Sequence, residues 1–219
     1  MIRDVTILIP ALNEEKTIGK VIGGATERGW IVLVGDNGST NGTHDISVSK
    51  GVTPLSVLRR GKGYAIRELI KHASTPLVVM IDGDGTYFIE DVQRVLKALK
   101  DCDVVLGCRR HKEKGSMALL HIIGNYLLSM LASVLYDYRV GDVNTGLKAF
   151  RTDKLKEFKL TSGDFTLEAD IFVNAIRHKC RMRQVPISYK ARPDGSKSKL
   201  RMLDGFKIGW FLIKERFRG

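Results

Sequence analysis

Short apolar runs punctuate the first half of the chain, and each is bounded by charged residues, glycine or proline. The runs cover residues 5–9, 31–34, 77–81 and 104–106 and are rich in valine, isoleucine and leucine. Continuous apolar runs of this length are typical of strands that are buried on both faces, as in a parallel sheet. The pattern therefore predicts buried parallel strands at these four places.

Between and after these runs, apolar residues recur three and four positions apart, which is the spacing of one face of an α-helix. Three sets of residues follow this spacing: Ile18, Val21, Ile22 and Ala25; Ile66, Leu69, Ile70 and Ala73; and Ile89, Val92, Leu96 and Leu99. Strands that alternate with one-sided helices predict an α/β fold, with a mostly parallel central sheet covered on both faces. In such a sheet, ligands bind beyond the carboxyl ends of the strands.

The pattern changes after residue 106. Residues 117–136 form a long apolar stretch that is nearly long enough to cross a membrane. The stretch also fits a helix that packs on the sheet or lies flat in a membrane interface, with a stripe made of Leu119, Ile122, Ile123, Tyr126, Leu127 and Met130. All three interpretations stay open. Residues 206–218 interleave aromatic residues with lysine and arginine, which predicts an amphipathic helix suited to a lipid headgroup layer.

Positive charge is concentrated near the end of the chain. The formal net charge is +12, and residues 177–219 hold 13 lysines and arginines against 3 acidic residues. A segment this basic either faces an anionic partner or forms a solvated surface. An anionic membrane surface or a phosphate-bearing substrate fits, whereas a nucleic-acid partner is not expected because no recognisable binding motif accompanies the charge. The 3 cysteines form no CxxC pair, which is typical of a reducing cytosol.

Polar turns follow the first two predicted strands. Asn13 and Glu14 come after the first strand, and Asp36, Asn37 and Gly38 come after the second. Carboxylates and amides at such strand ends can accept hydrogen bonds from a nucleotide base or ribose, and glycine lets the backbone approach closely. These turns are therefore candidates for nucleotide recognition, although the same residue types also make ordinary turns.

Two carboxylates, Asp82 and Asp84, follow the strand predicted at residues 77–81. Their charges repel each other unless a cation lies between them and a polyanion. Mg²⁺ or Mn²⁺ fits, because either ion takes few protein carboxylates and completes its shell with water and diphosphate oxygens. The segment 82–86 also matches the DxDGT pattern of haloacid-dehalogenase-type phosphatases, so a phosphohydrolase with Asp82 as nucleophile is an alternative. Against that alternative, the phosphatase motif usually follows the first strand of a chain.

Eight segments spread along the chain resemble one set of sequence motifs. Segments 9–14, 34–43 and 60–63 resemble P-x-x-N-E, V-x-D-D-G-S-x-D-x-T and N-x-G-K-G elements, and residues 82–84 take the place of a D-x-D metal element. Segments 106–110, 142–151, 167–170 and 192–197 resemble G-S-R, D-x-x-S/T-G-F-K-x-F-R, E-x-E/D and R-x-x-G-x-S-K elements. In combination these segments resemble family-2 glycosyltransferases, and specifically the polyprenyl-phosphate (dolichyl-phosphate) hexose synthases. The resemblance covers most of the chain.

The resemblance implies a Rossmann-like nucleotide-diphospho-sugar transferase (GT-A) fold and assigns roles to residues. Nucleotide-sugar binding falls to Pro10, Leu12, Asn13, Glu14, Asp36, Asn37, Gly38, Lys62, Asp82 and Gly83, and metal binding to Asp82 and Asp84. Acceptor binding falls to Arg109, Thr145, Gly146, Lys148, Glu168, Asp170, Arg192, Ser196 and Lys197. The catalytic roles fall to Asp84, Arg192, Lys197 and Arg109.

The chain length predicts one domain over residues 1–219, because it is long enough for one substantial core and short for two. Residues 1–110 are expected to bind the nucleotide sugar, residues 111–200 the acceptor, and residues 201–219 to form a basic amphipathic helix at the membrane surface.

The implied reaction is the transfer of a hexose, with inversion, from a UDP- or GDP-linked donor to a polyprenyl or dolichyl phosphate. A lipid phosphate needs no general base, because the second pKa of a phosphate monoester lies near ~6. We expect peripheral attachment to the cytoplasmic side of the cell membrane, where the basic segment meets anionic lipids. A family-2 transferase that acts on a soluble or other glycan acceptor is the remaining alternative.

Overall fold

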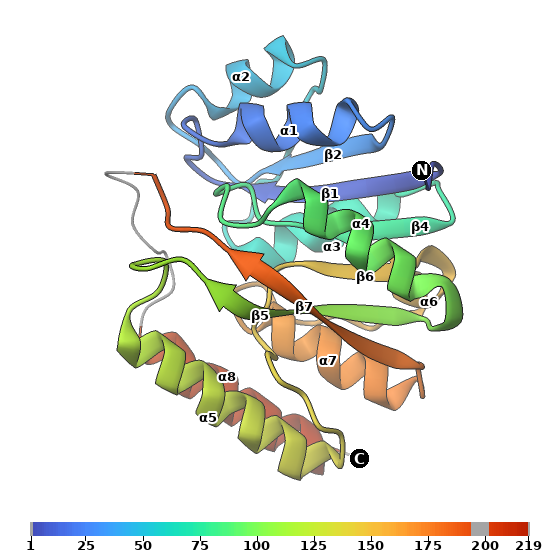
Figure 1. The fold of residues 1–219 in the computed structure, drawn as a ribbon, viewed down its shortest axis with the longest axis vertical. Coiled ribbons are helices and arrows are strands. Elements are labelled where there is room, and N and C mark those ends of the chain that lie inside the picture. Colours follow the sequence, from blue (N-terminus) through green and yellow to red (C-terminus); the bar gives the residue numbers. More distant parts are fainter. Residues whose placement is uncertain (1, 194–201, 219) are drawn as a thin grey trace.

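A computed structural model describes residues 2–193 and 202–218. Its centre is a seven-stranded sheet with the order β3-β2-β1-β4-β6-β5-β7 (Figure 1). The strands are β1 (Val5–Ala11), β2 (Ile31–Asp36), β3 (Leu55–Ser56), β4 (Leu77–Met80), β5 (Val104–Lys112), β6 (Lys148–Arg151) and β7 (Met182–Tyr189).

Strand direction makes the sheet mostly parallel. β1 pairs in parallel with β2 and β4, and β7 pairs in parallel with β5. β6 lies antiparallel between β4 and β5 and is the one reversed strand in the described part of the chain. The four predicted strands correspond to β1, β2, β4 and β5, so the predicted α/β fold with a mostly parallel sheet is confirmed.

Helices cover both faces of this sheet (Figure 1). They are α1 (Ile18–Thr26), α2 (Thr43–Ser49), α3 (Lys62–His72), α4 (Ile89–Ala98, extended by the 3₁₀ turn Leu99–Asp101), α6 (Thr152–Glu157) and α7 (Leu167–Arg177). Alternate residues of β1 serve the two faces: Ile7 and Ile9 join a core with α1 and α4, whereas Leu8 joins a core with α3 and α7. The apolar faces predicted for the three helices are thus the faces that pack on the sheet.

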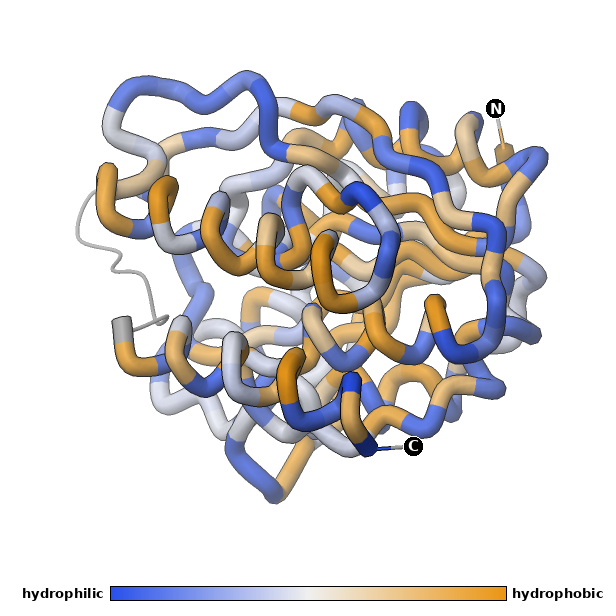
Figure 2. Tube along the Cα trace, turned by 90° about the horizontal axis from the view of Figure 1, so that it is seen from below, coloured by the Kyte–Doolittle hydropathy of each residue, from blue (hydrophilic) through white to orange (hydrophobic). Residues whose placement is uncertain are grey.

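Two further helices, α5 (Leu119–Tyr136) and α8 (Met202–Phe217), lie side by side outside these layers (Figures 1 and 2). Within α5 only Ser129 and Ala132 are buried. The apolar stripe predicted on this helix is exposed, with Leu119 at 69% and Tyr126 at 67%. The predicted stripe therefore does not pack on the sheet, because it points to solvent. The helix meets the core through another face, with Ala132 buried and Leu128 and Leu131 packed beside it. By length and composition α5 could cross a membrane, so the interfacial and spanning interpretations stay predictions.

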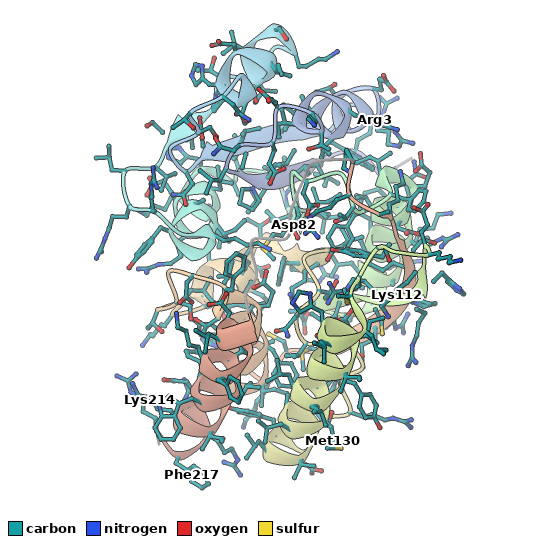
Figure 3. All side chains as sticks on the ribbon, turned by 90° about the vertical axis from the view of Figure 1, so that its left-hand side faces the viewer. Arg3, Asp82, Lys112, Met130, Lys214 and Phe217 are labelled. Carbon is teal, nitrogen blue, oxygen red and sulfur yellow. The ribbon has the colours of Figure 1, made fainter. Side chains whose placement is uncertain are left out.

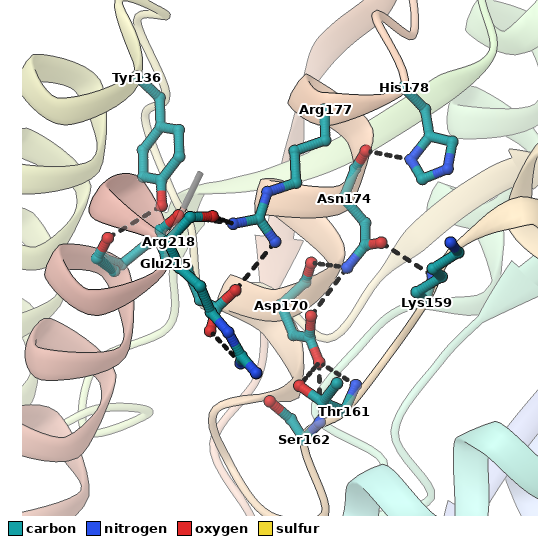
Figure 4. A network of polar contacts seen from close by, with 11 residues as sticks. Tyr136, Lys159, Thr161, Ser162, Asp170, Asn174, Arg177, His178, Glu215 and Arg218 are labelled. Atoms are coloured by element: carbon teal, nitrogen blue, oxygen red, sulfur yellow. Dashed lines mark hydrogen bonds and ion pairs between the residues drawn. The ribbon is translucent and has the colours of Figure 1, made fainter.

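Specific polar contacts attach α8 to its neighbours (Figure 4). Arg177 of α7 donates from Nη1 to Glu215 Oε2 at 2.9 Å and from Nη2 to the Glu215 carbonyl at 2.6 Å. The hydroxyl of Tyr136, at the end of α5, donates to the Leu212 carbonyl at 2.9 Å. Hydrogen bonds to backbone carbonyls depend on position as well as charge, so they fix the register of α8 against α5 and α7.

Candidate functional site

The loops after β1, β2 and β4 meet at the carboxyl edge of the sheet, where α5 and α8 also begin. A cavity of about 650 Å³ lies at this edge. Figure 3 shows Asp82 near the first residues of α5 and α8, and both helices run away from it. The cavity is lined by many of the residues that the sequence predicted: Pro10, Leu12, Glu14, Asn37, Lys62, Asp82, Gly83, Asp84, Arg109, Glu168 and Arg192.

Lys62 lies between two carboxylates in this cavity. Its Nζ is 2.6 Å from Asp82 Oδ1 and 2.5 Å from Glu168 Oε1. Burial alone would lower the pKa of Lys62, but the two carboxylates outweigh burial and raise it. Burial likewise opposes ionisation of Asp82, yet Lys62 outweighs it and lowers the pKa of that carboxyl. Lys62 and Asp82 are therefore both charged at neutral pH.

Backbone packing explains how Lys62 reaches this position. α3 begins at Lys62 itself, between Gly61 and Gly63. Gly61 has a φ of 137°, a conformation that other residues rarely adopt. A Cβ at either glycine would strike the backbone of residues 162–163, and the Gly63 N–H donates to the Gly163 carbonyl at 3.0 Å. The two glycines thus let the segment before α7 pack against the start of α3, which brings Glu168 beside Lys62.

Asp84 is the second carboxylate of this loop, and both of its oxygens have partners. Oδ1 accepts from the Thr86 hydroxyl at 2.6 Å and from the Thr86 N–H at 3.1 Å. Oδ2 lies 2.5 Å from Arg192 Nη2. Burial would lower the pKa of Arg192, but Asp84 outweighs burial and raises it. Asp84 is therefore held rigidly, with a cation on the side that faces the cavity.

Arg109 and Asp142 form a buried bidentate ion pair. Arg109 Nε and Nη2 each lie 2.7 Å from the Asp142 carboxylate, and the Arg109 N–H also donates to it at 3.1 Å. Asn125 of α5 adds a hydrogen bond from Nδ2 to Asp142 Oδ1 at 3.0 Å. Burial would raise the pKa of Asp142, but Arg109 outweighs burial and lowers it, so the pair is ionised. No role was predicted for Asp142 from the sequence, although this residue opens the 142–151 element.

The donor atoms at the end of β4 fit a hard divalent cation. Asp82 and Asp84 offer carboxylate oxygens from one loop, which is the chemistry that Mg²⁺ and Mn²⁺ prefer. Among the described residues there is no group of three or more histidine, cysteine, aspartate or glutamate side chains that could hold a metal ion alone. The remaining positions in the shell of such an ion would therefore come from water and from phosphate oxygens of a substrate.

Comparison with known proteins identifies the family. The model of the family described as "Glycosyl transferase family 2" matches residues 6–158. The chain belongs to glycosyl transferase family 2. The phosphohydrolase alternative is thereby wrong, and the fold agrees, because β1, β2 and β3 precede Asp82 whereas the phosphatase motif usually follows a first strand.

Curated relatives of this family-2 glycosyltransferase include two proteins of Haloferax volcanii. Glycosyltransferase AglJ is 33% identical over 98% of this chain and 71% of its own length. A dolichyl-phosphate hexose transferase is 29% identical over 89% of this chain and 86% of its own length. Among solved structures, glucosyl-3-phosphoglycerate synthase from Mycobacterium tuberculosis, in complex with Mn²⁺ and UDP-glucose, superposes with a TM-score of 0.75. That superposition covers 97% of this chain and 77% of the synthase at 20% identity, and it confirms the GT-A fold.

Three of the residues predicted to bind the nucleotide sugar are not among those that line the cavity of the glycosyltransferase. Asn13, which has a φ of 54°, accepts from the Thr40 N–H at 2.8 Å. Asp36 accepts from the Ser39 N–H at 2.9 Å. These contacts shape the loop that contains Gly38, the third such residue. Asn37 does line the cavity, and its Nδ2 donates to the Arg59 carbonyl at 2.7 Å.

Asp170 is likewise placed away from the cavity by helix geometry. Residues two positions apart on a helix point in nearly opposite directions, so Glu168 faces the cavity and Asp170 faces the core. Asp170 Oδ2 accepts from the backbone N–H groups of Thr161 and Ser162 at 2.7 and 2.8 Å (Figure 4). This predicted acceptor-binding residue instead holds the segment that packs against α3.

The predicted residues of the 142–151 element lie beneath the cavity floor. The Gly146 N–H donates to the Tyr87 hydroxyl at 2.6 Å, and a Cβ at Gly146 would strike the Asp82 carboxylate. Lys148 is fully buried and donates to the Thr145 carbonyl, and burial lowers its pKa to about 8. Ser196 and Lys197, the last two predicted residues, lie outside the described residues. Tyr87 and Tyr189 also line the cavity, with their rings 5.2 Å apart, and no sequence motif predicted a role for either.

Proposed function

We propose that this chain transfers a hexose, with inversion, from a UDP- or GDP-linked donor to a polyprenyl phosphate at the cytoplasmic membrane surface, using Mg²⁺ or Mn²⁺. One domain carries the reaction: residues 1–110 bind the donor, residues 111–200 the acceptor, and residues 201–219 meet the membrane. The relative named dolichyl-phosphate hexose transferase supports this acceptor. The synthase structure that holds Mn²⁺ and UDP-glucose supports the donor and the ion.

One observation carries the proposal: the cavity joins a charged end to an apolar end. The charged end is the corner of Lys62, Asp82 and Asp84. The apolar end runs between α5 and α8, where the walls are Leu120, Gly124, Leu128, Gly205 and Ile208. An acceptor with a phosphate head and a hydrocarbon tail matches both ends, whereas a small polar acceptor would leave the apolar walls against water.

Departure of the nucleoside diphosphate builds negative charge at the charged end. Lys62, kept protonated by Asp82 and Glu168, is placed to stabilise that charge electrostatically. When bound at Asp82 and Asp84, a divalent ion supplies Lewis-acid stabilisation of the leaving diphosphate. The acceptor phosphate is ionised near neutral pH, with a second pKa near ~6, so the protein needs to position it and need not remove a proton.

The acceptor phosphate needs cations on the opposite side of the hexose. Arg192 lines the cavity, and its pairing with Asp84 through Nη2 leaves the guanidinium with further donors. Arg109 also lines the cavity, but Asp142 already neutralises it. We therefore assign the main grip on the acceptor phosphate to Arg192, together with Lys197, and give Arg109 the lesser share.

The outer faces of α5 and α8 support a peripheral position on the membrane. Leu203, Phe206 and Trp210 recur on one face of α8 and are exposed, as is the stripe of α5. Lys207, Lys214 and Arg216 add positive charge to α8. Aromatic residues with cations suit a layer of anionic headgroups, where each lysine or arginine contributes roughly 1 kcal/mol.

A transfer assay with competing acceptors tests this function. The purified chain is given UDP- and GDP-hexoses with Mn²⁺, and either polyprenyl phosphate in detergent, 3-phosphoglycerate, or no acceptor. We expect the lipid acceptor and one of these donors to form a hexosyl lipid phosphate. With 3-phosphoglycerate or without an acceptor, we expect at most trace products. Transfer to 3-phosphoglycerate but not to the lipid would assign a soluble acceptor. Release of inorganic phosphate from small phosphomonoesters, without any sugar transfer, would contradict a transferase altogether.

A further inference from the structure

Three polar atoms in the wall of the cavity lack hydrogen-bond partners. Ser116 Oγ, Asn125 Oδ1 and Asn144 Oδ1 are buried, and the described part of the chain offers none of them a partner. All three residues line the cavity. Buried polar atoms in native proteins are almost always hydrogen-bonded, so three unpaired atoms in the lining of one cavity point to a partner that the protein does not supply.

The orientation of Asn125 is fixed by its other contact. The side-chain amide meets the Asp142 carboxylate at 3.0 Å, and Arg109 keeps that carboxylate ionised. An ionised carboxylate can only accept a hydrogen bond, so the atom of Asn125 that faces it must be Nδ2. The unpaired atom is therefore a carbonyl oxygen, which accepts and cannot donate. The Arg109–Asp142 pair thus acts as a positioning device for Asn125.

Carbonyl oxygens select the kind of group that can lie against them. They repel phosphate oxygens and accept from hydroxyl groups, while a hydrocarbon chain would leave them unpaired. Among the parts of the proposed substrates, hydroxyl groups occur on the hexose and on the ribose of the nucleotide. Asn144 stands two residues before Gly146, which packs against Asp82. The residues with unpaired atoms thus lie next to the corner where the diphosphate is proposed to bind. The hexose is attached to the diphosphate, so it must lie beside that corner too.

We infer that Asn125 and Asn144, together with Ser116, accept hydrogen bonds from hydroxyl groups of the donor hexose and so determine which sugar is used. This inference rests on the proposed function, because it takes a sugar nucleotide as the ligand. It places donor-specificity residues in three segments of the part otherwise proposed to bind the acceptor: the turn before α5, α5 itself and the 142–151 element. A site built to pair with a hydroxyl rejects an analogue that lacks it, since the partner atom is then left buried and unpaired.

Binding measurements can separate the contribution of the hexose to donor affinity from that of the nucleoside diphosphate. Isothermal titration with Mn²⁺ compares UDP with UDP-glucose, and GDP with GDP-mannose, for wild type, Asn125→Ala and Asn144→Ala. For the sugar nucleotide that wild type binds more tightly than its nucleoside diphosphate, each variant should lose about 10-fold in affinity, the order expected for one hydrogen bond. Affinity for the nucleoside diphosphate should stay within about 2-fold. Gln93→Ala, which removes an amide from α4 outside the cavity lining, should change neither affinity.

A second measurement distinguishes recognition from a merely structural role. Donor analogues that lack one hexose hydroxyl should bind wild type more weakly than the parent donor. For at least one of these analogues, Asn125→Ala or Asn144→Ala should bind the analogue and the parent donor with equal affinity. Equal losses for the nucleoside diphosphate and the sugar nucleotide would overturn the inference, as would a change in acceptor KM alone. If wild type bound no sugar nucleotide, the proposed function and the inference would both fail. If the variants lost donor affinity as expected but the chain transferred the hexose to a different acceptor, only the proposed acceptor would be refuted.

Discussion

Arg192 and Asp84 form an ion pair at the mouth of the cavity, with Nη2 2.5 Å from Oδ2. Thr86 occupies the other oxygen of the same carboxylate. A divalent ion that binds Asp84 must therefore share or displace the contact with Arg192. The arginine that we propose to hold the acceptor phosphate is thus held, in this structure, by a residue that we propose to bind the metal.

Removal of this arginine should have opposite effects on metal binding and on turnover. Arg192→Ala should raise the affinity for Mn²⁺, measured without nucleotide, by about 3- to 10-fold, because a competing cation is gone. The transfer rate should fall by about 30-fold or more, in line with the roughly 2 to 5 kcal/mol lost when a buried charged pair is broken. Arg28→Ala, which removes a cation in the turn after α1 that pairs with Glu90, should change neither quantity. Unchanged or weaker Mn²⁺ binding in Arg192→Ala would show that the ion pair does not limit metal access.

A methyl group at residue 146 should disturb the metal site without altering any charge. A Cβ at this position would strike the Asp82 carboxylate, so Gly146→Ala should move Asp82 and lower metal-dependent turnover by at least about 10-fold. Gly23→Ala on α1 is the matched control, because nothing lies within 4 Å of its added Cβ. The control should keep full activity and gain about 0.5 to 1 kcal/mol in stability. Full activity in Gly146→Ala would mean that the position of Asp82 does not matter.

The sequence predicted the strands and helices whose apolar spacing is regular, and it missed those whose identity depends on neighbours. β1 and β4 coincide with apolar runs, so the local residue pattern alone predicts that they are buried. β7 instead mixes polar and apolar residues without a regular period and contains Pro186, which an edge strand tolerates. Its pairing with β5 is set by the sheet and not by local propensity.

The candidate site divides in a similar way. Asp82, Asp84 and Lys62 were found because each belongs to a short motif that ends a strand or starts a helix. Asp142 and Asn125 were missed as functional residues because they meet only through tertiary contacts, 17 positions apart. Asp170 was assigned to the acceptor because a motif gives residue order, whereas the helix turns residues 168 and 170 to opposite sides.

The exposed aromatic face of α8 should control attachment to lipid. Phe206→Glu combined with Trp210→Glu should lower recovery with anionic liposomes in a flotation assay by at least about 10-fold, because two large apolar side chains no longer enter the interface. Val48→Glu, on the exposed surface of α2, is the matched control and should float like wild type. Wild type should also float better with anionic than with neutral vesicles at low salt. Equal recovery of wild type and the double variant would place the membrane contact elsewhere.

The buried amine of Lys148 should appear in the pH dependence of stability. Its pKa is lowered by burial from 10.5 to about 8, so between these values the unfolded chain binds more protons than the folded chain. Stability from this group therefore rises as pH increases from about 8 towards 10.5, and the penalty is fully present below pH 8. Relative to Lys148→Met, wild type should gain about 2 to 3 kcal/mol of unfolding free energy between pH 7 and pH 10. Parallel curves for the two proteins in urea unfolding would mean that the amine is not buried in its charged form.

The most direct test of the central claim is a crystal structure of the chain with a bound sugar nucleotide and Mn²⁺. Anomalous density for manganese should lie beside the carboxylates of Asp82 and Asp84, with the diphosphate between that ion and Lys62. A sugar nucleotide bound with its diphosphate away from Asp82 and Asp84, or bound there without manganese at a saturating concentration, would contradict the claim.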